Sequence, residues 1–237
     1  MYKNKNVFCF ILARGGSKGL PRKNTFMIAG KPLIGHNIDL AKNVKYIDKI
    51  FVSTEDKEIK EISLKHGAII IDRPLELASD TAYYLDAVKH MMSKIEESYK
   101  KNYIVVILET TFPMRKIEHV EKCIEMYDEN VDVIMSVNEV KTHPSRMFTK
   151  NKDGFLSYLF DLPRISNRQE ATPVFAANGS IIVTNHDFLQ SQQKIIFGGR
   201  MKGFVLDEKY SMDIDSKLDY DICKLLMESE HFNSNNK

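Results

Sequence analysis

A chain of 237 residues, 43% hydrophobic and 28% charged, is long enough to bury one substantial core and is typical of a soluble globular protein. A formal net charge of +2 is too small to predict a nucleic-acid or membrane partner, and no apolar run approaches the ~20 residues that a membrane helix needs. Three widely spaced cysteines and a start without a signal sequence predict reduced thiols in a cytoplasmic protein.

Strands and helices are predicted to alternate along the first part of the chain. The continuous apolar run 7–12 is typical of a strand buried on both faces, and Asp80 or Thr81 is expected to cap a long helix. Strands are predicted over 7–12, 49–54, 68–71, 103–108 and 131–137, and helices over 32–41, 56–66, 80–99 and 117–127.

This alternation lapses between about residues 141 and 173. The segment predicts an inserted lobe, a hairpin that covers the site or pairs with another subunit. Strands are expected again at 175–184 and 203–206, and residues 229–237 are expected to form a flexible tail. Ser216 is predicted to cap a last helix through Leu226 whose inward face carries Leu218, Ile222, Leu225 and Leu226.

The predicted fold is a single α/β domain over residues 1–237, with a mainly parallel sheet and helices on both faces. In such sheets ligands bind outside the carboxyl ends of the strands. Candidate functional residues are therefore sought directly after each strand.

The loop after the first strand has the composition of an anion-binding loop. Glycines let its backbone N–H groups approach phosphate oxygens, and four cations accompany them: Arg14, Lys18, Arg22 and Lys23. The loop matches neither the Walker A nor the dinucleotide-binding pattern. The alternative is a solvated basic turn, but the position directly after a buried strand favours phosphate binding.

A second candidate is the pair Asp213 and Asp215, which alternate with apolar residues. On a short strand both carboxylates would lie on one face, where a divalent cation such as Mg²⁺ could join them. Alternatively, Asp215 begins the last helix and Asp213 faces water. The residues alone leave both interpretations open.

Several arginines follow predicted strands or lie in the inserted lobe. Arg73 and Arg115 are expected to point toward the ligand edge, although either could instead hold a surface turn. The lobe and its flanks contribute Arg146, Arg164 and Arg168, which could capture an acidic second substrate or be solvated. No Ser/His/Asp or Cys/His set predicts a covalent nucleophile.

Taken together, the motifs resemble those of the acylneuraminate cytidylyltransferases, the CMP-sialic acid synthetases. They occur in order over nearly the whole chain, which makes the set specific although each motif alone is not. The matching segments are 11–24, 73–82, 143–144, 178–181, 212–215 and 218–219.

The resemblance implies a Rossmann-like fold of the nucleotide-diphospho-sugar transferase type, Mg²⁺ dependence, and a homodimer in which the inserted lobe reaches toward the neighbouring subunit. It also implies that the anomeric hydroxyl of a 2-keto-3-deoxy sugar acid attacks the α-phosphate of CTP, giving a CMP-sugar and pyrophosphate. A metal-bound water or carboxylate near Asp213 would accept the hydroxyl proton.

The resemblance assigns residues to each part of the reaction. Arg14, Lys23 and Asp213 would be catalytic, and Asp213 and Asp215 would bind the metal. The nucleotide would contact Ala13, Arg14, Gly15, Ser17, Lys18, Lys23, Asn24, Arg73 and Ala82. The sugar acid would contact Glu109, Arg168 and Asn178.

Three positions on the sugar side depart from the family pattern. Glu109 stands where a glutamine is common, Ala176 replaces an arginine, and Tyr84 replaces a small serine. An anion at position 109 would suit a sugar that bears an amine, or would be neutralised by an arginine. The expected acceptor is therefore a nonulosonic acid other than plain N-acetylneuraminic acid.

Two other functions remain as alternatives. One is nucleotidyl transfer to another acceptor, either the eight-carbon Kdo acid or a sugar phosphate. The other is a non-catalytic nucleotide-sugar binding protein. The presence of Asp213 and Asp215 together with Arg14 and Lys23 favours a catalytic protein over this alternative.

Overall fold

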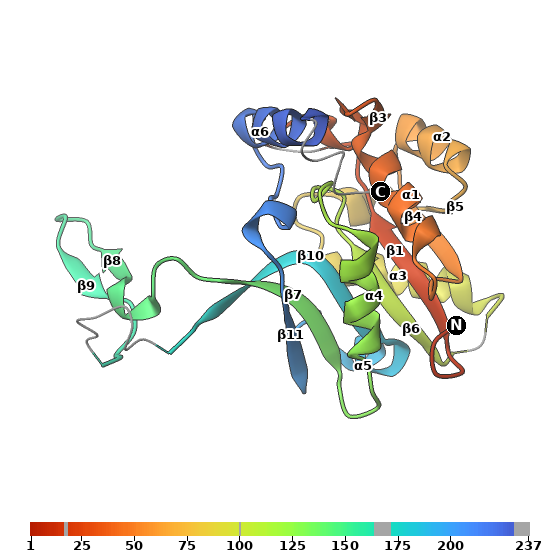
Figure 1. Ribbon diagram of the computed structural model, residues 1–237. Coiled ribbons are helices and arrows are strands. Elements are labelled where there is room, and N and C mark those ends of the chain that lie inside the picture. The colour runs from red at the N-terminus through yellow and green to blue at the C-terminus, as the bar shows by residue number, and fades with distance from the viewer. Residues whose placement is uncertain (17–18, 100, 164–171, 230–237) are drawn as a thin grey trace.

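A seven-stranded sheet forms the centre of the molecule in the computed structural model, which describes residues 1–16, 19–99, 101–163 and 172–229 (Figure 1). The strand order is β11-β7-β10-β6-β1-β4-β5. The strands are β1 (Asn6–Leu12), β4 (Lys49–Thr54), β5 (Ile69–Asp72), β6 (Tyr103–Leu108), β7 (Val133–Glu139), β10 (Phe175–Asn185) and β11 (Met201–Val205). The Rossmann-like α/β fold predicted from the sequence is therefore confirmed.

The remaining elements are helices and two small hairpins. The helices are α1 (Leu33–Asn43), α2 (Lys57–Lys65), α3 (Tyr84–Glu96), α4 (Ile117–Glu125), α5 (His186–Ser191) and α6 (Lys217–Glu228). The hairpins pair β2 (Met27–Ile28) with β3 (Lys31–Pro32), and β8 (Phe148–Lys150) with β9 (Leu156–Tyr158). The short 3₁₀ helices are η1 (Lys23–Thr25), η2 (Leu75–Ala78), η3 (Pro144–Arg146) and η5 (Glu208–Tyr210).

Each face of the sheet packs into its own apolar cluster, as the alternation of side chains along β1 illustrates. Val7, Cys9 and Ile11 pack on one face with α1, α2 and α4, whereas Phe8 and Phe10 pack on the other face with α3 and α5. Because both faces are covered, the strand is apolar at every position from Val7 to Leu12, which explains the unbroken hydrophobic run in the sequence.

One strand runs against its neighbours. β10 is antiparallel to both β6 and β7, whereas β1, β4, β5 and β6 pair in parallel. Its register shifts between Ala177 and Ile182, and Ile181 lies opposite Leu108 at the carboxyl end of β6. The bulge therefore brings Asn178 and Gly179 to the edge where the parallel strands end.

Two predictions about helices were wrong. The helix expected after Asp80 or Thr81 begins only at Tyr84, without a side-chain cap, and ends at Glu96. In α6 Ser216 does cap the helix by accepting a hydrogen bond from the Asp219 N–H. However, Leu218 and Leu225 are mostly exposed, and the helix buries Cys223 and Met227 instead. Leu226, the fourth residue predicted to face inward, does pack against this cluster.

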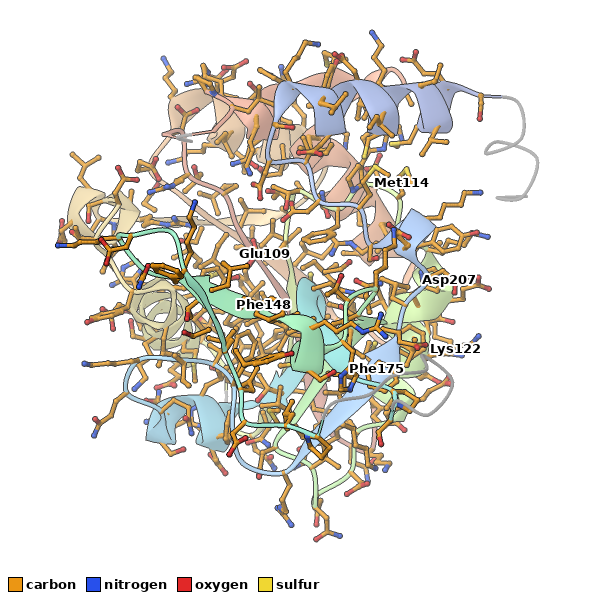
Figure 2. All side chains as sticks on the ribbon, turned by 90° about the vertical axis from the view of Figure 1, so that its left-hand side faces the viewer. Glu109, Met114, Lys122, Phe148, Phe175 and Asp207 are labelled. Atoms are coloured by element: carbon orange, nitrogen blue, oxygen red, sulfur yellow. The ribbon has the colours of Figure 1, made fainter. Side chains whose placement is uncertain are left out.

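The β8–β9 hairpin projects from the body as an arm beyond the ends of β7 and β10 (Figure 1). In the view of Figure 2 the arm points toward the reader, with Phe148 and Phe175 labelled. Apolar side chains are exposed on it and at its base: Phe148, Phe155, Leu156, Tyr158, Leu159, Phe160, Leu162 and Phe175. Among the described residues, no helix combines the length and apolar character required to span a membrane.

Candidate active site at the carboxyl edge of the sheet

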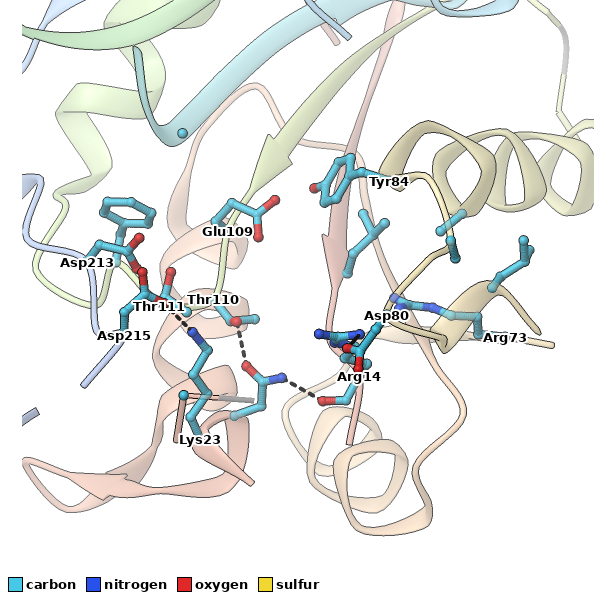
Figure 3. Close-up of a pocket in the computed structure, with 18 of the residues that line it drawn as sticks. Arg14, Lys23, Arg73, Asp80, Tyr84, Glu109, Thr110, Thr111, Asp213 and Asp215 are labelled. Carbon is cyan, nitrogen blue, oxygen red and sulfur yellow. Dashed lines mark hydrogen bonds and ion pairs between the residues drawn. The ribbon is translucent and has the colours of Figure 1, made fainter. Parts of the chain in front are cut away.

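A pocket of about 600 Å³ opens where β1, β5 and β6 end (Figure 3). The loops after these strands line it, together with the β10 bulge and the segment before α6. Its polar and charged side chains include Arg14, Lys23, Asn24, Arg73, Asp80, Tyr84, Glu109, Thr110, Thr111, Asn178, Asp213 and Asp215. The site therefore lies at the edge of the sheet predicted from the strand order.

A buried asparagine connects the loop after β1 to the loop after β6. Asn24 donates from Nδ2 to the Arg14 carbonyl oxygen at 3.0 Å, and Thr110 Oγ1 donates to Asn24 Oδ1 at 2.5 Å. These bonds are drawn as dashed lines in Figure 3. Asn24 thus holds two walls of the pocket together.

The cations of the first loop point in different directions. Arg14 lines the pocket and pairs with Asp80 at 2.9 Å. Lys23 also lines it, with Nζ at 2.8 Å from Asp215 Oδ1 and 3.1 Å from the Ile214 carbonyl oxygen. Arg22 instead binds Asp56 and Glu58 on the far side of the loop and does not line the pocket.

Two predicted nucleotide contacts have other partners in this structure. The Gly15 N–H donates to Glu55 Oε1 at 2.7 Å, and the Ala13 N–H donates to the Ser53 carbonyl oxygen at 3.0 Å. Neither residue lines the pocket, whereas Asn24, Arg73 and Ala82 do. Ser17 and Lys18 lie outside the described residues.

Arg73 is held rigidly beside the loop. Its Nε donates to Ser53 Oγ at 2.9 Å and its Nη2 donates to the Ser53 carbonyl oxygen at 2.7 Å. Burial lowers the pKa of the guanidinium, and the nearby Glu55 carboxylate opposes this effect. A cation placed this way could reach a ligand without losing much side-chain entropy.

Asp213 and Asp215 both line the pocket, but the predicted strand is absent, since residues 212–215 have no regular secondary structure. The Ile214 N–H donates to the Thr111 carbonyl oxygen at 3.0 Å, and this bond holds the segment against the loop after β6. Gly19 packs so closely on Asp215 that a Cβ atom there would lie 2.6 Å from its carbonyl oxygen.

The carboxylate of Asp213 is partly desolvated. Its Oδ1 atom is buried without a hydrogen-bond partner, while Thr111 bonds to the carboxylate. Burial raises the pKa of Asp213, and the neighbouring Asp215 carboxylate raises it further. A cation between the two carboxylates would relieve both effects.

The other end of the pocket contains Tyr84, Glu109 and Asn178. Tyr84 and Glu109 face each other, with the phenol directed toward the carboxyl group (Figure 3). Burial raises the pKa of both groups. Asn178 accepts from Ser136 Oγ at 2.5 Å and donates to Asn138 Oδ1 at 2.9 Å, so its side chain is fixed. Arg168, predicted to contact the sugar, lies outside the described residues.

Arg115 does not point toward the ligand edge as expected. It is buried and donates to the carbonyl oxygens of Ser180 and Glu109 and to Asn37 Oδ1. Burial lowers its pKa to about 10. Arg115 therefore supports the pocket from behind. Ala176, where the family has an arginine, lies outside the pocket lining.

The sequence patterns missed Asp80, Thr110 and Thr111 as pocket residues. Asp80 was interpreted as a helix cap, yet it lines the pocket and pairs with Arg14. Thr110 and Thr111 follow β6 directly, which is where ligand-edge residues were sought. The two hydroxyl side chains directly after a predicted strand were the signal in the sequence that could have identified these pocket residues.

A family model described as Cytidylyltransferase matches residues 8–228. The chain belongs to the cytidylyltransferase family. The curated relatives include an N-acylneuraminate cytidylyltransferase of Streptococcus agalactiae serotype V, which is 34% identical over 90% of this chain. This chain spans about half of that relative, since the match covers 51% of it.

Other relatives match over nearly their whole length. The CMP-N,N'-diacetyllegionaminic acid synthase of Legionella pneumophila is 32% identical, with 94% of this chain and 96% of the relative covered. The pseudaminic acid cytidylyltransferase of Campylobacter jejuni is 31% identical, with 96% and 98% covered. A solved CMP:2-keto-3-deoxy-manno-octonic acid synthetase shares the fold, with a TM-score of 0.70 at 18% identity and coverages of 94% and 98%.

Proposed function

We propose that the protein transfers CMP from CTP to the anomeric hydroxyl of a 2-keto-3-deoxy sugar acid of the sialic-acid type. The observation that carries the proposal is a single pocket that joins Arg14 and Lys23 to Asp213 and Asp215, in a chain of the cytidylyltransferase family. The relatives named for sialic, legionaminic and pseudaminic acids support an acceptor of this class.

In the proposed reaction the anomeric oxygen attacks the α-phosphorus of CTP. The bond from that phosphorus to the bridging oxygen of the β-phosphate breaks, pyrophosphate leaves, and the hydroxyl proton passes to the Asp213 carboxylate. Lys23 and Arg14 stabilise the negative charge on the phosphates by position.

Mg²⁺ fits the carboxylate pair. The unpartnered Oδ1 of Asp213 and the adjacent Asp215 carboxylate offer the oxygen ligands that Mg²⁺ prefers, and substrate phosphates would complete the set. Among the described residues no group of three or more carboxylate, imidazole or thiol ligands lies together, so the site would depend on the nucleotide. When bound, the ion would neutralise charge on the phosphates.

Pyrophosphate release from each nucleoside triphosphate tests the proposal, with a panel of sugar acids and with or without Mg²⁺. Release that requires CTP, a sugar acid and Mg²⁺ is the expected result, and Asp213→Asn and Asp215→Asn should each lower turnover by at least about 100-fold. Failure of every sugar acid to support release would overturn the proposal. Full turnover after chelation of Mg²⁺ would contradict the proposed role of the metal.

A further inference from the structure

A glutamate at the end of β4 holds the main chain of the loop after β1. Glu55 is the first residue after β4, and its Oε1 atom accepts a hydrogen bond from the Gly15 N–H at 2.7 Å. The carboxylate contacts the loop without lining the pocket. A hydrogen bond from a main-chain N–H to a carboxylate is charge-assisted and is stronger than one between neutral groups. Glu55 therefore fixes the start of the loop that contributes cations to the pocket.

The peptide unit between Arg14 and Gly15 is held at both of its polar ends. Its N–H donates to Glu55, and its carbonyl oxygen, which belongs to Arg14, accepts from Asn24 Nδ2 at 3.0 Å (Figure 3). Asn24 is itself buried and bonded to Thr110. Because a peptide unit is planar, hydrogen bonds at its opposite ends fix the orientation of the plane. The main-chain torsion angles that adjoin this peptide are restricted with it.

The side chain of Arg14 extends from this peptide into the pocket. There it pairs with Asp80 at 2.9 Å. A bound triphosphate would compete with Asp80 for the guanidinium, so the ion pair alone does not hold Arg14 for the phosphates. The direction in which the side chain leaves the main chain is set by Glu55 and Asn24. A charged group that is held in position before the ligand arrives loses less entropy on binding.

The loop also packs closely on the turn that contains Glu55. A Cβ atom at Gly15 would lie 2.6 Å from Asp56 Oδ2, which is too close for a real contact. Asp56 is fixed as the N-cap of α2, where its side chain accepts from the Ile59 N–H at 3.0 Å. Glycine at position 15 therefore lets the loop come close enough to form the hydrogen bond with Glu55.

The second carboxylate oxygen of Glu55 is stabilised by charge. Oε2 is buried, and no described residue forms a hydrogen bond with it. The Arg73 guanidinium attracts the carboxylate electrostatically and is itself held by two hydrogen bonds to Ser53. Since Ser53 holds it independently, Arg73 should keep its place when Glu55 is replaced. A substitution of Glu55 therefore acts mainly on the Arg14–Gly15 peptide.

We propose that Glu55 is a positioning residue for the triphosphate: it holds the Arg14–Gly15 peptide so that Arg14 is directed toward the phosphates of the nucleotide. This proposal rests on the proposed function and adds a residue to the nucleotide side of the same site. Glu55 itself does not touch the substrates. The Gly15 N–H, expected from the sequence to bind phosphate, serves this internal hydrogen bond instead.

Calorimetric titrations with CTP and with cytidine, both with Mg²⁺ and without an acceptor acid, test the proposal. Glu55→Met removes the hydrogen-bond acceptor and should raise the Kd for CTP at least about tenfold. The Kd for cytidine should stay within about twofold, because cytidine carries no phosphate for Arg14 to bind. Glu55→Gln keeps an acceptor oxygen for the Gly15 N–H and should return the Kd for CTP to within about threefold of the wild-type value.

Glu58→Met is the matched control from the same turn of the chain. The Glu58 side chain is 56% exposed and pairs with Arg22 outside the pocket, so CTP affinity should stay within about twofold. Gly15→Ala provides a second route to the same defect, because its methyl group would crowd Asp56 and push the loop away from Glu55. It should weaken CTP binding and spare cytidine binding, as Glu55→Met does.

Initial rates add a readout that a general loss of structure would not give. In Glu55→Met the KM for CTP should rise at least about tenfold while the KM for the sugar acid stays within about twofold. Urea denaturation checks that each variant is folded under the assay conditions. A loosened fold would instead raise both KM values together.

The outcomes separate this proposal from the proposed function. A wild-type protein that binds no CTP, or that transfers CMP to no sugar acid, would overturn the proposed function and this proposal with it. Equal CTP affinity in the wild type and in Glu55→Met would overturn the role of Glu55 while leaving CMP transfer intact. Equal weakening of CTP and cytidine, or no recovery in Glu55→Gln, would overturn it in the same way.

Discussion

Arg22 and Lys23 are neighbours in one basic loop, yet only Lys23 faces the pocket. Lys23 contacts Asp215 at 2.8 Å, whereas Arg22 pairs with Asp56 and Glu58 near the start of α2. Spacing along the sequence could not distinguish them because the direction of each side chain depends on the turn. Arg22 itself adopts a left-handed conformation, with a φ of 60°, and this turns it away from Lys23.

This difference predicts opposite effects of two similar substitutions. Lys23→Met should lower kcat by at least about 100-fold because a phosphate-stabilising charge is lost. Arg22→Met should leave kcat within about threefold, since it removes only exposed ion pairs. Initial rates of CTP-dependent pyrophosphate release measure both, and equal losses in the two variants would contradict the assignment.

Arg115 predicts a loss of stability rather than of binding. Replacing it with methionine leaves the Ser180 and Glu109 carbonyl oxygens and Asn37 without a buried donor. The free energy of unfolding should fall by about 3 kcal/mol or more. Urea denaturation measures this change. Lys217→Met, which removes an exposed pair with Asp221, is the control and should cost less than about 1 kcal/mol.

Among the elements, α4 contains a titratable cap. His119 accepts a hydrogen bond at Nδ1 from the Lys116 N–H at 3.1 Å, which requires the unprotonated nitrogen. Burial lowers the pKa of His119 below its unfolded value of 6.5, and the nearby Glu118 carboxylate opposes this. The unfolded state therefore binds more protons, so stability is complete above pH 6.5 and falls as the pH drops toward the folded pKa.

We expect His119→Gln to remove about 1 kcal/mol of the stability difference between pH 7 and pH 5, because glutamine still offers an acceptor oxygen but does not titrate. Chemical denaturation at the two pH values measures the difference. An unchanged pH dependence in His119→Gln would show that the cap does not contribute.

The presence of a strand or helix was easier to predict than the side of a helix that faces the core. The run 49–54 was predicted with its observed bounds, and the strand is buried from Ile50 to Thr54 around the apolar residues Ile50, Phe51 and Val52. In α6 the apolar residues at 218, 222 and 225 follow a helical period, yet they lie on the exposed side. The body of the protein contacts Cys223 and Met227, and only the packed chain shows which stripe meets the core.

At the scale of the whole molecule, the exposed arm predicts that the chain forms a homodimer. Large apolar side chains are exposed on the β8–β9 hairpin, including Phe155 at 74% and Leu156 at 62%. We propose that a second copy of the chain covers them in a homodimer, since contiguous apolar surface of this kind marks interaction sites.

Replacing both Phe155 and Leu156 by aspartate should convert the dimer to a monomer without loss of secondary structure. Sedimentation velocity measures the change in mass, and circular dichroism checks the fold. Leu225→Asp on the exposed side of α6 should leave the dimer intact. A wild-type protein that sediments as a monomer at all concentrations would refute the arm as a dimer contact.

The sequence by itself determined the strand–helix alternation, the edge of the sheet that contains the site, and the resemblance to a cytidylyltransferase. These follow from local periodicity and from glycines, cations and carboxylates in ordered motifs. Only the tertiary structure decided that β10 runs antiparallel, that Arg115 is buried, and that Tyr84 and Glu109 face each other. Such contacts join residues far apart in the chain, and their geometry arises only when the sheet and its helices pack.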